Sequence, residues 1–142
     1  MVVCLTLDSS VIIAALNQHE RQHRECRSLL ERVKDGEFIA LEPYTVLVEV
    51  AAAIRRRTGD RDLARRVRDS LQDIETLNFL ELTTGRATMA SQIAEETATR
   101  GMDAIVIQVA REFDIPLISL DAEMIGRARA LVKTEAVEDL AR

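Results

Sequence analysis

The segment Val2-Val3-Cys4-Leu5-Thr6-Leu7-Asp8-Ser9-Ser10 decides the fold class. Its first six residues are rich in strand formers, and Asp8-Ser9-Ser10 is a helix N-cap cluster that leads into an expected helix over 11–17. A buried strand that passes directly into a helix is typical of proteins in which the two elements alternate.

The same alternation continues along the chain. Further strands are expected at 38–41, 79–82, 115–120 and, as a short last strand, 136–137. Helical spacing of apolar residues predicts the intervening helices, which are 21–34, 43–57, one that carries Leu63, Val67, Leu71 and Ile74, 86–100, 103–113 and 121–132. Strands separated by helices predict an α/β fold, with a parallel sheet covered by helices on both faces.

Composition limits the class of protein. The 142 residues are 47% hydrophobic and 30% charged, which predicts a single globular domain over 1–142. No apolar stretch approaches the ~18 residues of a membrane span, and the first residues lack signal-peptide features, so a cytoplasmic protein with no membrane partner is expected. The two cysteines belong to no CxxC or Cys/His cluster, which argues against zinc and disulfides.

Four acidic residues are expected to meet at one edge of the sheet. Asp8 and Asp121 come directly after apolar strands, and the carboxyl ends of parallel strands share an edge. Asp103 lies in the first turn of a helix after Gly101, and Glu49 is the single charge in the apolar helical run 46–54. Helix capping is the competing explanation for each aspartate, and a solvent-facing position is the competing explanation for the glutamate.

Carboxylates gathered in this way would repel one another by roughly 4 kcal/mol per close pair at an intermediate dielectric. A divalent cation removes that repulsion, and Mg²⁺ prefers oxygen ligands. The four acids therefore predict a site for Mg²⁺ or Mn²⁺.

Other carboxylate enzymes fit the sequence less well. A haloacid-dehalogenase-type phosphatase needs a second aspartate two residues after the first, where Ser10 stands. The acidic pair of a response-regulator receiver and the glycine-rich first turn of a dinucleotide-binding domain are both missing after the first strand.

Four segments in order resemble the PIN-domain family, and within it the small VapC-type toxin ribonucleases of toxin–antitoxin pairs. They are Leu-Thr-Leu-Asp8-Ser9-Ser10, Val-Leu-Val-Glu49-Val-Ala-Ala-Ala, Gly101-Met-Asp103-Ala-Ile-Val-Ile and Pro116-Leu-Ile-Ser119-Leu-Asp121. The resemblance implies a Rossmann-like α/β/α sandwich and a Mg²⁺- or Mn²⁺-dependent endoribonuclease. It further implies that Asp8, Glu49, Asp103 and Asp121 are catalytic and hold the metal, with Ser9, Ser10 and Ser119 orienting them.

The resemblance also implies partners, namely an RNA substrate, an antitoxin protein and a second copy of the chain in a homodimer. The alternative is a PIN-like RNA-binding or regulatory protein that is catalytically weak and stands outside a toxin–antitoxin pair.

A basic segment interrupts an otherwise acidic chain. Seven arginines and two aspartates between Arg55 and Arg68 give a local charge of +5. Because the whole chain has a net charge of −5, the rest of the chain carries −10. Such a segment is typical either of a phosphate-binding face or of a solvated helix. The candidates for contacts with RNA or a protein partner are Arg55, Arg56, Arg57, Arg61, Arg65 and Arg68.

Overall fold

The computed structural model describes residues 3–141, and its centre is a four-stranded sheet in which all neighbouring strands are parallel. The strand order is β3-β2-β1-β4. The strands are β1 (Val3–Leu7), β2 (Phe38–Pro43), β3 (Leu77–Leu80) and β4 (Leu117–Ile118). The α/β prediction is confirmed; Val2, which the sequence assigned to the first strand, lies outside the described residues.

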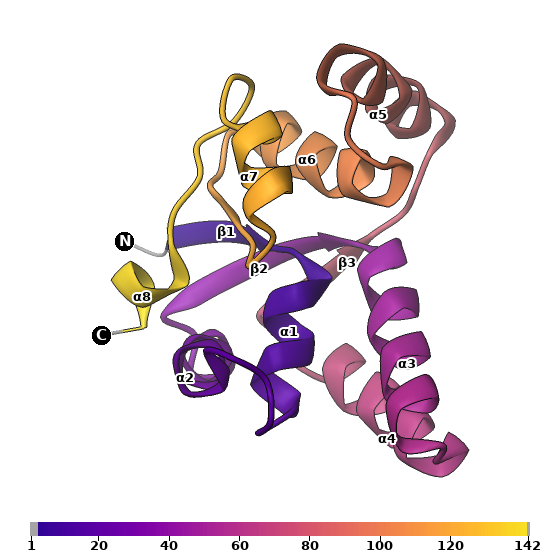
Figure 1. Cartoon of the computed structure of the whole chain (residues 1–142), viewed down its shortest axis with the longest axis vertical. Coiled ribbons are helices and arrows are strands. Elements are labelled where there is room, and N and C mark those ends of the chain that lie inside the picture. Colours follow the sequence, from indigo (N-terminus) through magenta and orange to yellow (C-terminus); the bar gives the residue numbers. More distant parts are fainter. Residues whose placement is uncertain (1–2, 142) are drawn as a thin grey trace.

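Helices cover both faces of the sheet (Figure 1). The first four lie on one face, and α5, α6 and α7 lie on the other. None of the helices within residues 3–141 combines the length and apolarity needed to cross a bilayer. The helices are α1 (Ser9–Leu16), α2 (His23–Lys34), α3 (Tyr44–Thr58), α4 (Arg61–Gln72), α5 (Thr84–Thr97), α6 (Gly101–Phe113), α7 (Ala122–Ala128) and α8 (Val137–Leu140).

The apolar core fills the space between the sheet and its two helical layers. On α3, Val46, Val50 and Ile54 recur every four residues and are buried, because residues at that spacing share one face of a helix. Glu49 lies beside this face and is half-buried. The helix therefore holds a carboxylate at the border between core and solvent.

Several predicted boundaries were wrong. The strand expected at 115–120 is only Leu117–Ile118, and the helix expected at 86–100 is Thr84–Thr97. The third strand is Leu77–Leu80 rather than 79–82, since Leu77 is the buried residue that pairs with Ala40. The helix expected over 121–132 ends at Ala128, and the chain beyond it forms an isolated bridge between Leu117 and Thr134.

The strand expected at 136–137 is also wrong, because Val137 begins the short helix α8. The side chain of Val137 is buried in the core. An apolar residue can be buried from a strand or from a helix, and Val137 is buried from a helix.

The strand order reverses at β1, which has β2 on one side and β4 on the other. Backbone bonds fasten this junction, since Thr6 N donates to Pro116 O and Asp8 N donates to Ile118 O, both at 2.9 Å. In open parallel sheets, ligands bind beyond the carboxyl ends of the strands at such a reversal. Asp8 and Asp121 both follow strands that end there.

Candidate active site

Two serine hydroxyls hold the carboxylate of Asp8. Ser10 Oγ and Ser119 Oγ both donate to Asp8 Oδ2, at 2.7 and 2.9 Å. The serines are fixed in turn, because Ser10 Oγ accepts from Leu120 N (3.1 Å) and Ser119 Oγ accepts from Asp121 N (3.0 Å). Asp8 is 5% exposed, and no described residue donates to its Oδ1. One oxygen is thus anchored, and the other is left for a ligand.

Glu49 and Asp103 reach the same region from helices α3 and α6. Burial, followed by repulsion from Asp8, raises the pKa of both carboxyls. Repulsion from Asp103 adds to the rise at Glu49, and repulsion from Asp121 adds to the rise at Asp103, while the Ser9 hydroxyl lowers the pKa of Glu49. Each of the four acids therefore lies within electrostatic reach of at least one other.

Helix capping accounts for one of the three aspartates. Asp121 Oδ1 accepts from Glu123 N (3.0 Å) and Met124 N (3.2 Å) at the start of α7. Asp8 occupies the N-cap position of α1 but makes no cap bond with its side chain, and Asp103 lies inside the first turn of α6. Capping by the side chain therefore does not account for Asp8 or Asp103.

Arg100 connects two of the acids. Its Nε lies 3.3 Å from Asp103 Oδ2, and its Nη2 lies 3.1 Å from Asp121 Oδ2. The carboxylates come from different elements, so this guanidinium links the start of α6 to the end of β4. The sequence reasoning missed Arg100, although its place directly before Gly101-Met-Asp103 was a signal.

Glu42 is a further acid that the sequence reasoning missed. It lies near the end of β2, is 0% exposed, and its Oε2 accepts from Leu7 N at 2.7 Å. Its Oε1 finds no hydrogen-bond partner among residues 3–141. Burial, with a smaller contribution from repulsion by Asp8, raises the pKa of Glu42 well above its ordinary value. The signal in the sequence was a lone acid at the end of a predicted strand, next to Pro43.

Two cavities adjoin three of the four acids, whereas Asp8 lines neither of them. Glu49 and Asp103 line one of about 560 Å³, and Asp103 and Asp121 line another of about 320 Å³. Arg100 lines both. A molecule that enters either cavity therefore meets Asp103 and the guanidinium together.

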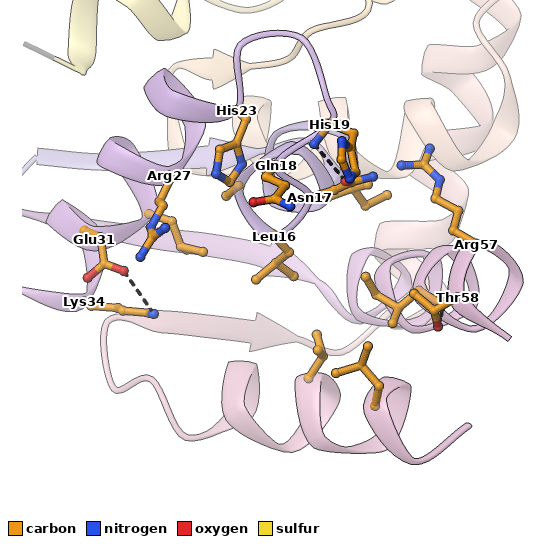
Figure 2. Close-up of a pocket in the computed structure, with 16 residues that line it drawn as sticks. Leu16, Asn17, Gln18, His19, His23, Arg27, Glu31, Lys34, Arg57 and Thr58 are labelled. Atoms are coloured by element: carbon orange, nitrogen blue, oxygen red, sulfur yellow. Dashed lines mark hydrogen bonds and ion pairs between the residues drawn. The ribbon is translucent and has the colours of Figure 1, made fainter. Parts of the chain in front are cut away.

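A separate cavity of about 650 Å³ lies among the first four helices, and Figure 2 shows the residues that line it. Its lining includes the basic residues Arg27, Lys34 and Arg57 together with Leu16 and apolar residues of neighbouring helices. None of the four acids lines it. This cavity is therefore distinct from the acidic edge of the sheet.

The acids do not form a closed set of metal ligands. Among residues 3–141, no group of three or more His, Cys, Asp or Glu side chains is arranged to hold a metal ion. The donors nevertheless suit a hard cation, because they are all carboxylate oxygens, one of them free on the buried Asp8. Two other carboxylate oxygens contact Arg100.

The basic segment lies away from the acids. Arg55 follows Glu49 by six residues on α3, which is about 9 Å along the helix axis. Arg65, Arg66 and Arg68 form ion pairs with Asp62 or Asp69 on the surface of α4. Arg57 pairs with Glu20, whereas no ion-pair partner is found among residues 3–141 for Arg55, Arg56 and Arg61.

Comparison with known proteins agrees with the α/β fold. The family model for the PIN domain matches residues 5–130. VapC20 of Mycobacterium tuberculosis, a toxin that cleaves the sarcin-ricin loop, is 17% identical, with a TM-score of 0.72 over 86% of this chain and 93% of that one. The DNA-bound VapBC of Salmonella typhimurium is 16% identical, with a TM-score of 0.70 over 95% and 98%.

VapBC-1 of nontypeable Haemophilus influenzae is 13% identical, with a TM-score of 0.69 over 96% and 99%. No curated protein matches the chain by sequence. At these identities the structural likeness shows the fold, while the family model covers most of the 142 residues. The chain belongs to the PIN-domain family.

Proposed function

We propose that the chain is a divalent-metal-dependent endoribonuclease and the toxin of a type II toxin–antitoxin pair. The observation that carries the proposal is the placement of Asp8. This buried carboxylate lies at the strand reversal with one oxygen anchored by two serines and the other free. A capping aspartate would occupy the N-cap position and also accept a hydrogen bond from the helix with its side chain. Asp8 occupies the N-cap position of α1, but its side chain makes no cap bond.

The four acids have different roles in this proposal. Asp8 and Asp103 are direct or water-bridged ligands of Mg²⁺ or Mn²⁺, while Asp121 and Glu49 complete the negative pocket. Ser10 and Ser119 orient Asp8 through the bonds described above. When bound, the cation supplies the positive charge that offsets negative charge on the phosphoryl and leaving oxygens.

An antitoxin is the proposed protein partner. Support comes from the solved relatives, which include a toxin–antitoxin complex from Klebsiella pneumoniae at 18% identity and a TM-score of 0.63. RNA as the substrate fits the exposed arginines of α3 and α4, since they supply positive charge on an otherwise acidic molecule. We also propose that the chain forms a homodimer, as its resemblance to the VapC-type toxins implies.

Cleavage of RNA with defined metals tests the proposal. The wild-type protein should cut single-stranded or loop RNA with Mg²⁺ or Mn²⁺ and should not cut it in EDTA. Asp8→Asn and Asp103→Asn should each lower the rate at least about 100-fold, because they remove charge from the proposed ligands. The matched control is Asp60→Asn, an exposed N-cap of α4 that an amide can also serve.

An absence of RNA cleavage would support the alternative of a regulatory PIN-like protein without catalysis. In that case the wild type, Asp8→Asn and Asp103→Asn would all leave structured and unstructured RNA intact with either metal.

A further inference from the structure

Arg100 occupies the N-cap position of α6 with its side chain among the acids. A guanidinium carries only donors and cannot accept a cap bond from the helix, so its contacts are with carboxylates. The guanidinium contacts Asp103 and Asp121, which are separated by 18 positions in the sequence, through one Oδ2 atom of each. Within residues 3–141 it is the one cation that forms an ion pair with any of the four acids.

A second arginine nearby, Arg127, contacts different partners. Arg127 also lines the cavity of about 320 Å³. It pairs with Glu123, one helical turn away on α7, at 3.3 Å and donates to the backbone oxygen of Thr97 at 3.1 Å. Neither partner belongs to the four acids, so Arg127 shares the cavity with Arg100 but not its contacts.

We propose that Arg100 is an internal counter-ion that competes with the divalent cation for Asp103 and Asp121. The inference rests on the metal site proposed above. It adds Arg100 as a residue that sets the affinity of that site for the divalent cation. The guanidinium neutralises part of the acidic pocket in the metal-free protein. It must leave those two oxygens before a cation can bind the Oδ2 atoms of both carboxylates.

Exchange of this kind is physically easy. The side chain of Arg100 is 80% exposed, against 15% for Asp103, so the arginine can swing into water without losing a buried environment. A guanidinium carries one positive charge and cannot balance several carboxylates, whereas a divalent cation brings two charges at a shorter range. The arginine therefore weakens metal binding but does not prevent it.

Titration calorimetry with Mn²⁺ tests the inference directly. Arg100→Ala should bind Mn²⁺ about 2- to 30-fold more tightly than the wild type, the range expected when two exposed ion pairs no longer compete. Arg100→Lys should fall between them, since one ammonium cannot span both carboxylates as the planar fork does. Arg127→Ala should bind like the wild type.

Thermal unfolding separates competition from a purely structural role. In EDTA, Arg100→Ala should melt below the wild type, because the acids lose their counter-ion; with saturating Mn²⁺ the difference should vanish or reverse. A structural role would lower the melting temperature equally in both conditions.

Two outcomes would overturn the inference. If the wild type binds Mn²⁺ and Arg100→Ala binds it equally or less tightly, competition is refuted while the metal-dependent function stands. If neither protein binds Mn²⁺ at millimolar concentration, both proposals fail together. Binding by Arg100→Ala alone would support competition in its strongest form.

Discussion

Asp8 and Glu42 are acids near the ends of neighbouring strands, and only the first was recognised from the sequence. Asp8 stands out because an apolar strand stops there and a helix follows. Glu42 lies between Leu41 and Pro43, and its complete burial depends on elements packed over it from distant parts of the chain. Likewise the contacts of Arg100 depend on how α6 meets the end of β4. Tertiary burial and pairing of this kind leave little trace in local sequence.

Glu42 should make stability depend on pH. Its raised pKa means that the folded protein keeps a proton above the ordinary value of 4.5, where the unfolded chain has lost it. Unfolding then releases a proton, so the free energy of unfolding falls as pH rises above about 4.5, by at most about 1.4 kcal/mol per pH unit from this group. Glu42→Gln removes the titration and should gain stability relative to the wild type as pH rises.

Urea unfolding of the wild type and Glu42→Gln from pH 5 to 8 measures this difference. The amide can still accept from Leu7 N, so the bond at the end of β1 is kept. An unchanged difference in stability across that range would show that Glu42 is ionised in the folded protein.

At the scale of elements, the sequence predicted the helices and strands best where apolar periodicity was long. The run 46–54 placed α3, whereas the short apolar stretch 115–120 located β4 but overestimated its length, since the strand is only Leu117–Ile118. Prediction failed after Ala128, where the chain is held by a bridge between Leu117 and Thr134 rather than by a regular element. The strand at 77–80 was displaced because Leu77, and not Leu82, packs in the core.

The arginines of α3 and α4 should contribute unequally to RNA binding. Arg56 has no ion-pair partner among residues 3–141, whereas Arg65 is paired with Asp62 and Asp69. If the segment contacts phosphates, Arg56→Ala should reduce the slope of log K against log salt by about one. Arg65→Ala should change the slope less, because two carboxylates already offset its charge.

Fluorescence anisotropy with a labelled RNA over a range of salt concentrations gives these slopes, with the inactive Asp8→Asn background preventing cleavage. Equal slopes for Arg56→Ala and its parent would remove that arginine from the interface with RNA.

At the scale of the whole molecule, the order β3-β2-β1-β4 creates the site. It places the reversal of strand order between β1 and β4, so that Asp8 and Ser119 meet from positions 111 residues apart. The two helical layers then bring Glu49 from one face of the sheet and Asp103 from the other (Figure 1). The α/β architecture and the shared edge followed from the alternation of strands and helices, whereas the depth of each acid required the packed structure.

We propose above all that this edge of the sheet binds a divalent cation. A crystal of the wild-type protein grown with Mn²⁺ and measured for anomalous scattering tests it most directly. We predict a peak at coordination distance from carboxylate oxygens of Asp8 and Asp103, with Arg100 turned away from Asp103 and Asp121. A map without a peak at this edge, in which Arg100 still contacts both carboxylates at millimolar Mn²⁺, would show that the edge does not bind the cation.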